Sequence, residues 1–317
     1  MPATEGSRGG GATGCESGNL GCACFPNDSC LDALECIDGL CVDLSGDGDG
    51  DGDGDGDGDG DGDGDGDGDG DGDGDGDGCG ETIEGMICIP PGLYEMGCNS
   101  LVDDICGDDE WPYHPVTIRA FYVDLDEVMT NDYEACVEDE FCTASEMGGG
   151  CNVGIDGRSE HPINCVTWVQ ATNYCLWQGK RLPSEAEWEK AARGTDGRIF
   201  PWGNDPESCE FVVIDDGVPG CGTGSTMPVG SLPAGSSVYE VRNMGGNVSE
   251  WVNDWYDVGY YGVSPDDDPV GPESGTYRVA RGGAWKELGA RVSRRGWSFA
   301  EYNFDTVGFR CARDGAG

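Results

Sequence analysis

The sequence predicts an α+β domain with little regular secondary structure, which follows a small disulfide-rich segment and an acidic linker. Three observations support this prediction. Residues 47–78 are an unbroken Asp-Gly repeat, and the 18 cysteines divide into six before it and twelve after it. The apolar segments after the repeat are short, with Gly-, Pro- and Asp-rich connections between them. The predicted parts are a disordered N-terminus (1–14), a cysteine-rich knot (15–42), an Asp-Gly linker (43–79) and a globular domain (80–317).

The Asp-Gly repeat contains 16 aspartates and 16 glycines. It has no apolar side chain to bury and carries a string of like charges, so it cannot form a core. Glycine makes such a tract flexible, and repulsion between the aspartates extends it. We interpret it as a solvated tether. The alternative is a weak calcium sink, because carboxylate oxygens are ligands that calcium prefers.

The formal net charge of the chain is −46, and removing the 16 aspartates of the repeat leaves about −30 on the rest. Nucleic-acid binding requires a basic face, so we expect no nucleic-acid partner. A charge of this size is compatible with salt-rich surroundings or with multivalent cations.

The cysteines before the repeat predict a disulfide knot. Their number is even and the stretch is short, which allows up to three bridges and 15 possible pairings. Zinc is the competing interpretation, but this stretch has no paired CxxC and no histidine. The six residues are Cys15, Cys22, Cys24, Cys30, Cys36 and Cys41.

The number of cysteines predicts an oxidising compartment, so we expect the protein to be extracellular, periplasmic or at the cell surface. No run of 18 apolar residues is present, so we expect no membrane-spanning segment. Residues 1–14 lack the apolar core of a signal peptide, so the export signal is not visible in this chain.

Two segments of the globular part predict helices with defined ends. Each begins with a hydroxyl residue that can cap the first turn and has Glu or Gln three residues later, and each ends at a glycine. A shorter helix is expected after Thr130. The first helix is capped by Thr167 with Gln170 and ends at Gly179; the second is capped by Ser184 with Glu187, ends at Gly194, and turns Leu182, Trp188 and Ala191 inward.

The other apolar segments are short and typical of strands. The clearest are VTIRAFYVD (116–124) and GFRCAR (308–313). Helices and strands of this kind, joined by long loops and by disulfides, give an α+β domain in which the loops form much of the fold.

A set of motifs follows one order along the globular part: IPPGLYEMG (89–97), DEWPYHPVTIRAFYVDLDEV (109–128), HPINCVTWVQATNYCLWQGKRLPSEAEWEKAARG (161–194), FPWGN (200–204), MPVGS (227–231), NMGGNVSEWVNDWY (243–256), YRVARGGAW (277–285) and VGFRCAR (307–313). Together they resemble the formylglycine-generating enzyme, or sulfatase-modifying factor, family over roughly residues 84–314. The resemblance implies a variant of the C-type lectin fold with little regular secondary structure.

The resemblance also implies a structural calcium site in NMGGNVSEW. The ligands would be the side chain of Asn243, the carbonyls of Gly246 and Val248, and the carboxylate of Glu250. Hard oxygen donors on an irregular loop suit this large cation. The alternative is a capped turn in which Glu250 forms an ion pair.

A disulfide between Cys175 and Cys311 is likewise implied by the resemblance. We further expect Cys209 and Cys221 to close the loop between FPWGN and MPVGS, and Cys98 and Cys106 to close another. No pairing is predicted for the other six cysteines of the globular part, which are Cys79, Cys88, Cys136, Cys142, Cys151 and Cys165.

Members of this family that generate formylglycine hold Cu(I) between two cysteine thiolates, which are the soft ligands that this ion prefers. The corresponding positions here are Glu287 and, allowing one residue of slippage, Arg291 or Val292. No cysteine lies between Cys221 and Cys311, so copper is not expected. Other members of the superfamily bind iron through histidines, but the two histidines here, His114 and His161, have the context of structural turns.

Three functions remain open. The first is an exported module that binds a peptide, protein or glycan in the family cleft. The second is an oxidoreductase with altered chemistry that uses Glu287 with a hard metal, and the third is a tethered surface scaffold. The predicted cleft residues are Ala284, Glu287, Arg291, Arg294 and Arg295, where arginines would attract an anionic ligand; Arg278 and Arg281 are expected to pair with an acidic surface.

Overall fold

The computed structural model describes residues 35–37, 40–42 and 78–315. The chain divides into two units, 1–74 and 75–317. In the first unit, β1 (Glu35–Ile37) and β2 (Leu40–Val42) form an antiparallel hairpin in which Cys36 lies opposite Cys41. The predicted disordered N-terminus, the other four cysteines of the knot and nearly all of the Asp-Gly linker lie outside the described residues.

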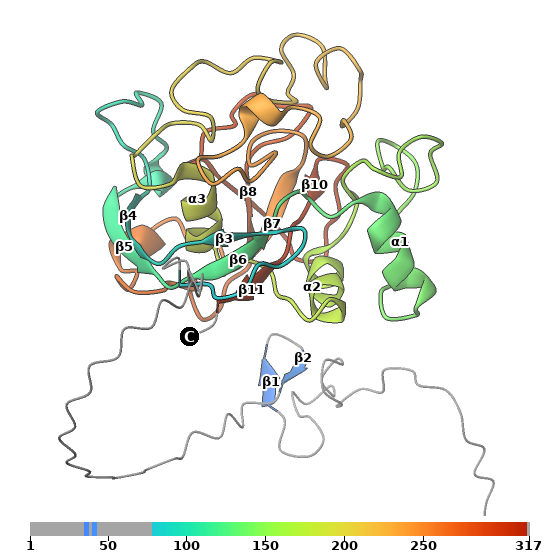
Figure 1. Cartoon of the computed structure of the whole chain (residues 1–317), viewed down its shortest axis with the longest axis horizontal. Helices are drawn as coiled ribbons and strands as arrows, with labels where there is room; N and C mark the ends of the chain where they lie inside the picture. The colour runs from blue at the N-terminus through green and yellow to red at the C-terminus, as the bar shows by residue number, and fades with distance from the viewer. Residues whose placement is uncertain (1–34, 38–39, 43–77, 316–317) are drawn as a thin grey trace, which may run out of the picture. The chain divides into compact units, whose positions relative to one another are not determined.

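The second unit combines short strands with three helices, and long loops connect them (Figure 1). The helices are α1 (Thr130–Glu138), α2 (Trp168–Trp177) and α3 (Glu185–Arg193), with short 3-10 turns η1 (Asp108–Glu110), η2 (Pro233–Gly235) and η3 (Tyr260–Gly262). The strands are β3 (Met86–Ile89), β4 (Gly92–Met96), β5 (His114–Ile118), β6 (Phe121–Asp124), β7 (Ser249–Trp255), β8 (Arg278–Arg281), β9 (Arg295–Ser298), β10 (Val307–Gly308) and β11 (Ala312–Asp314).

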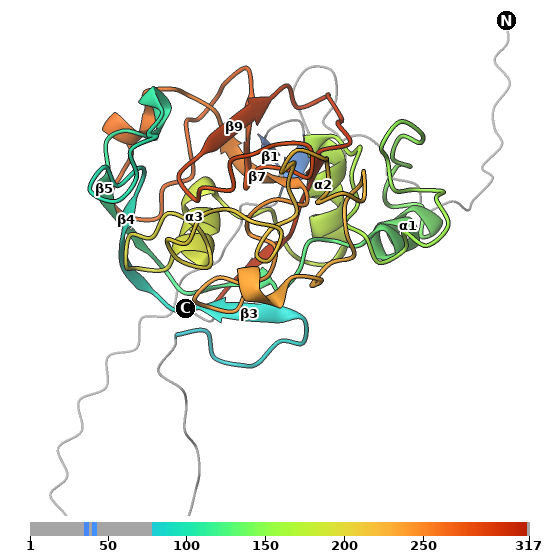
Figure 2. The ribbon, with the colours of Figure 1, turned by 90° about the horizontal axis from the view of Figure 1, so that it is seen from above.

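The strands of this unit form three sheets. The largest has the order β10-β7-β8-β9, so β9 is at one of its edges (Figure 2). Its only parallel pair is β10 with β7, which brings the end of the chain beside the middle of the domain. A three-stranded sheet has the order β11-β6-β3, and β4 pairs with β5.

The predicted helices are confirmed, including their first turns. Thr167 and Ser184 each form a capping box with the residue three positions later, Gln170 and Glu187. A capping box satisfies two amide donors that the helix itself leaves unpaired. The predicted short helix is α1.

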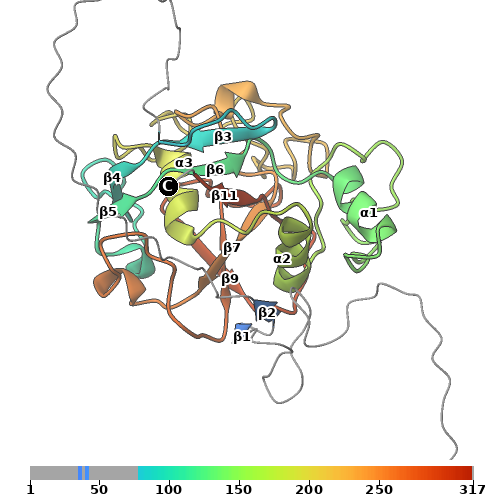
Figure 3. The ribbon, with the colours of Figure 1, turned by 60° about the horizontal axis from the view of Figure 1, so that its bottom comes forward.

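Helix α3 is buried on all sides, since it packs against β4, β5, β7 and β8. Figure 3 shows it beside β4 and β5. Leu182, Trp188 and Ala191 are buried as predicted. The charged side chains of the helix are buried as well, which its apolar pattern alone does not predict. They are Glu185, Glu187, Glu189, Lys190 and Arg193.

Two of the strand predictions differ from the structure. Residues 116–124 form two strands in different sheets, because the chain turns at Arg119, whose amide donates to Asp268 Oδ1 at 2.8 Å. In residues 308–313 the middle is not in a strand. There, Arg310 reaches across the core and Cys311 is bonded to α2, and these two long-range contacts set the backbone path.

Six disulfides join all twelve cysteines of residues 78–315. They include the pairs Cys175–Cys311, Cys209–Cys221 and Cys98–Cys106. The pairs that the sequence left open are Cys79–Cys88, Cys136–Cys142 and Cys151–Cys165. So many disulfides indicate a non-cytosolic protein. None of the described helices is long and apolar enough to cross a membrane.

Candidate functional site

A groove of about 330 Å³ lies beside the largest sheet, where segments from β7, β8, β9 and β10 meet. Four of its lining residues are small: Ala280, Gly282, Gly283 and Gly296. Hydroxyl groups, aromatic rings, one valine and one pair of opposite charges complete the lining. The hydroxyl residues are Ser249, Ser298 and Thr306, the aromatic ones Trp297 and Phe304, the valine is Val307, and the charged pair is Glu287 and Arg294.

Two adjacent glycines shape the groove where the chain leaves β8. Gly282 and Gly283 have φ angles of 95° and 72°, which side chains other than glycine rarely adopt. A Cβ atom on Gly283 would also lie only 2.8 Å from the carbonyl oxygen of Gly289. These two positions therefore require glycine for the turn.

Of the predicted cleft residues, Glu287 and Arg294 line the groove. They pair with each other, with 3.1 Å between Arg294 Nη2 and Glu287 Oε2. Arg294 also donates from Nη1 to the carbonyl of Leu288 at 2.9 Å. Both side chains are about two-fifths exposed, so the pair contributes little to stability.

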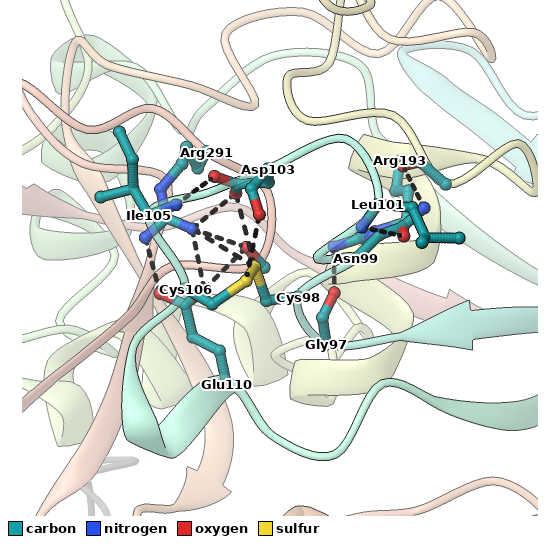
Figure 4. The surroundings of a disulfide bond; sticks show 12 residues. Gly97, Cys98, Asn99, Leu101, Asp103, Ile105, Cys106, Glu110, Arg193 and Arg291 are labelled. Atoms are coloured by element: carbon teal, nitrogen blue, oxygen red, sulfur yellow. Dashed lines mark hydrogen bonds and ion pairs between the residues drawn. A yellow bond between two sulfur atoms is a disulfide. The ribbon is translucent and has the colours of Figure 1, made fainter.

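Arg291 does not line this groove. Its guanidinium binds Glu110 through two contacts of 2.7 and 2.8 Å and Asp103 at 2.8 Å. Figure 4 shows it beside the Cys98–Cys106 disulfide, with these carboxylates around it. Val292 is fully buried in the core, so neither candidate for the second position of the family's cysteine pair faces the groove.

Arg295 and Ala284 do not line the groove either, and both side chains are buried. Arg295 binds both oxygens of Glu185, at 2.8 and 2.9 Å, and lies over the ring of Tyr261. A guanidinium held in this way by a buried carboxylate is not available to an anionic ligand.

Arg278 and Arg281, which were expected to pair with an acidic surface, are buried in the core. Arg281 bridges Glu185 and Glu189 of α3. Arg278 lies 3.7 Å from the ring centre of Trp168 and 3.5 Å from that of Trp255. The sequence places both in β8, but only the fold shows that buried carboxylates and indole rings surround this strand.

The predicted calcium loop precedes and enters β7. Asn243 and Gly246 have left-handed φ angles of 53° and 67°, which gives the loop an irregular path. Among the described residues, none donates a hydrogen bond to the carbonyls of Gly246 and Val248. Asn243 donates from Nδ2 to Glu127 at 2.8 Å, which leaves its Oδ1 available.

The carboxylate of Glu250 is buried and already paired. Its Oε2 accepts hydrogen bonds from Trp188 Nε1 and Arg310 Nε, both at 2.7 Å. Its Oε1 accepts only from Arg310 Nη2, also at 2.7 Å, and so keeps one lone pair for a further partner. The donor set therefore fits calcium if Glu250 shares its carboxylate between Arg310 and the ion.

The two histidines belong to different parts of the framework. His114 is the first residue of β5, and its Nδ1 lies 2.8 Å from the carbonyl oxygen of Pro112. His161 is buried, its Nδ1 lies 2.8 Å from Thr226 Oγ1, and burial lowers its pKa. Within residues 78–315, only one group of three His, Cys, Asp or Glu side chains brings its ligand atoms close enough together to hold a metal ion. It consists of Cys98, Asp103 and Cys106, and its two sulfurs are bonded to each other.

An aromatic row, which the sequence interpretation missed, flanks the groove. Neighbouring ring centres along it are 4.4 to 6.1 Å apart. The density of aromatic residues in WSFAEYNF (297–304) was a usable signal for it. The row consists of Tyr256, Trp297, Tyr277, Phe299, Tyr302 and Phe304.

Comparison with known proteins supports the resemblance seen in the sequence. Residues 76–315 match the Sulfatase-modifying factor enzyme 1-like domain. The formylglycine-generating enzyme of Streptomyces coelicolor is 32% identical over 73% of this chain and 89% of its own length. The serine/threonine-protein kinase Pkn1 of Chlamydia trachomatis is 36% identical over 65% of this chain, but the match spans only 35% of the kinase.

Comparison with solved structures also finds a similar fold. The structure of PvdO from Pseudomonas aeruginosa superposes with a TM-score of 0.63 and 28% identity, covering 72% of this chain and 94% of that one. This agrees with the C-type-lectin-like fold expected from the resemblance. The chain thus belongs to the sulfatase-modifying factor family.

Proposed function

We propose that this protein is an exported member of the family that binds a ligand in the groove and lacks the copper-dependent oxidation of formylglycine-generating relatives. The observation that carries the proposal is the pairing of all twelve cysteines of residues 78–315 in disulfides. A Cu(I) centre requires free thiolates, and the groove has none.

The groove itself supports a binding role. It is open, and it contains hydrogen-bonding groups beside exposed rings, which is a usual combination in ligand sites. At the first position of the cysteine pair, Glu287 is held by Arg294. A carboxylate that is already matched by a guanidinium is a poor nucleophile.

The second candidate is an oxidoreductase with altered chemistry, and the presence of Glu287 in the groove is the observation in its favour. A hard metal would need further oxygen ligands there. The other oxygen groups of the groove are hydroxyls, which bind such metals weakly. We therefore favour the binding function. The tethered-scaffold function depends on residues 43–77, which lie outside the described residues.

We further propose that calcium stabilises the loop at residues 243–250. Support comes from the open carbonyls of Gly246 and Val248, the open Oδ1 of Asn243 and the remaining lone pair of Glu250. The ion would fix an irregular loop directly before β7, and β7 contributes Ser249 to the groove.

Titration with Cu(I) under reducing but non-denaturing conditions tests the main proposal. We expect no stoichiometric tight binding, and no change in mass when a CxPxR peptide is incubated with the protein, copper and O₂. The Streptomyces coelicolor relative serves as the positive control. Tight copper binding together with a mass loss on the peptide cysteine would contradict the proposal.

A further inference from the structure

We propose that the groove and the aromatic row bind a neutral, β-linked oligosaccharide. This inference deepens the proposed function and rests on it, since it names the ligand class of the same groove. Four features carry it: exposed ring faces, unpartnered hydroxyls, balanced charge and the lack of an anchoring pocket.

The first feature is the exposure of three rings of the row. Trp297, Tyr302 and Phe304 are 51%, 49% and 42% exposed, although aromatic side chains of this size normally bury most of their surface. Two of them, Trp297 and Phe304, line the groove directly. Such rings present flat apolar faces on which the C–H face of a sugar ring can stack.

The exposed rings are held in place by half-buried ones. Tyr277 contacts Trp297 with ring centres 4.4 Å apart, and Phe299 contacts Tyr302 at 5.0 Å. Tyr277 and Phe299 also contact each other, at 4.7 Å. The platform is therefore ordered before a ligand arrives, which lowers the entropic cost of binding. Three exposed rings in one row can stack on successive units of a sugar chain such as a β-1,4-linked one.

The second feature is a set of three hydroxyl groups in the groove. The Oγ atoms of Ser249 and Ser298 and the Oγ1 atom of Thr306 have no hydrogen-bond partner among the described residues. Each can both donate and accept, which matches the hydroxyl groups of a sugar. A ligand with an apolar face and a hydroxyl rim satisfies the rings and these groups together.

The third feature is charge. The only charged side chains that line the groove, Glu287 and Arg294, neutralise each other. The rest of the chain is strongly acidic, with a formal net charge of −46. Its field repels anionic polymers, and the groove has no net charge with which to attract a cation. A neutral ligand is favoured over an acidic glycan.

The fourth feature separates a glycan from a peptide. Many peptides are anchored by a few side chains that fill well-packed pockets. The groove instead has glycines at three lining positions and flat rings beside them. It offers stacking surface and hydrogen bonds rather than an enclosed apolar pocket, and this combination fits a sugar chain better than a peptide anchor.

The test is isothermal titration of the full chain with cellohexaose, a neutral β-1,4-linked hexasaccharide. We expect saturable binding that does not weaken as salt is raised, because no ion pair forms. Trp297→Ala and Phe304→Ala should each weaken the affinity at least about tenfold, which corresponds to one lost aromatic contact of about 1.4 kcal/mol.

Phe141→Ala is the matched control for Phe304→Ala. Phe141 is 46% exposed, a fraction similar to the 42% of Phe304. It follows α1 and lies outside the groove and the aromatic row. It should leave the affinity within twofold, and melting temperatures should show that all variants fold.

The proposal is overturned if neither cellohexaose nor chitohexaose binds, or if binding survives in both Trp297→Ala and Phe304→Ala. A proline-rich decapeptide that binds with the same dependence on Trp297, when the hexasaccharides do not, would reassign the groove to peptides. Either result would leave the non-catalytic function intact if copper binding and peptide oxidation are still absent, so the two proposals fail separately.

Discussion

Arg291 and Glu110 form a two-contact ion pair, with 2.8 Å from Nη1 to Oε2 and 2.7 Å from Nη2 to Oε1. Glu110 is buried, and Arg291 is nearly so. The pair links the segment after β8 to η1, and Arg291 also binds Asp103 inside the disulfide loop at residues 98–106 (Figure 4). Arg291, one of the two positions that the resemblance matches to the second cysteine of the family's pair, is thus part of the framework.

Replacing Arg291 by alanine or cysteine should destabilise the protein by about 3–5 kcal/mol, because the carboxylates of Glu110 and Asp103 would be left buried without a counter-charge. Urea unfolding measures this change. Arg294→Ala is the control, and it should cost no more than about 1 kcal/mol because its pair is exposed. A similar loss of stability in both variants would show that the buried ion pairs of Arg291 stabilise the protein no more than the exposed pair of Arg294.

Glu185 should make the protein sensitive to acid. Burial tends to raise the pKa of this carboxyl, but Arg295 and Arg281 outweigh it and lower the pKa below the ordinary 4.5. A lowered folded-state pKa stabilises the protein above pH 4.5, and this contribution is lost as the pH falls through the folded value. As the pH is lowered from 7 to 3, the free energy of unfolding, measured in urea, should therefore fall less steeply for Glu185→Gln than for the wild type.

The same variant should already be less stable at neutral pH, by about 3–5 kcal/mol, because two buried guanidiniums lose their shared carboxylate. Parallel pH profiles for Glu185→Gln and the wild type would refute the role of Glu185 in the acid response.

Removal of calcium should lower the melting temperature of the wild type. Folded-state ligands stabilise by mass action, so the shift should grow with the calcium concentration restored. Asn243→Ala should remove most of this dependence, since it deletes an available ligand oxygen but leaves the Glu250–Arg310 pair in place. If chelator leaves the wild-type melting temperature unchanged, the loop does not bind calcium under those conditions.

Disulfide removal should have unequal effects. Cys175 and Cys311 are 136 positions apart, whereas Cys136 and Cys142 are 6 apart. In the chain-entropy description the long loop contributes about 5 kcal/mol and the short one about 2 kcal/mol. Replacing each pair with two alanines and measuring unfolding in urea tests this difference. Equal losses would indicate that packing around the sulfurs, rather than loop closure, sets the effect.

Local features of the sequence were sufficient to predict the helices. The caps at Thr167 and Ser184 depend on residues only three positions away, so their signal is contained in the sequence itself. The split at Arg119 was not predictable in this way, because it depends on Asp268, which is 149 positions distant.

The candidate site was predictable in part. Residue order placed Glu287 and Arg294 near the groove, but the same reasoning placed Arg291 and Arg295 there. Arg294 faces the groove, whereas Arg291 and Arg295 of the same segment bind carboxylates of the framework. These carboxylates, on Glu110 and Glu185, lie more than 100 positions away in the sequence. The aromatic row was visible in composition but was not recognised, because aromatic residues usually occupy a core.

Five of the six disulfides of residues 78–315 join cysteines no more than 14 positions apart. A chain that emerges into an oxidising compartment can therefore form these five bonds between cysteines that appear almost together. The bond from Cys175 must wait until Cys311 has emerged, close to the end of the sequence. Folding of residues 78–315 thus calls for little disulfide shuffling, and a single late oxidation completes the disulfides of this part of the chain.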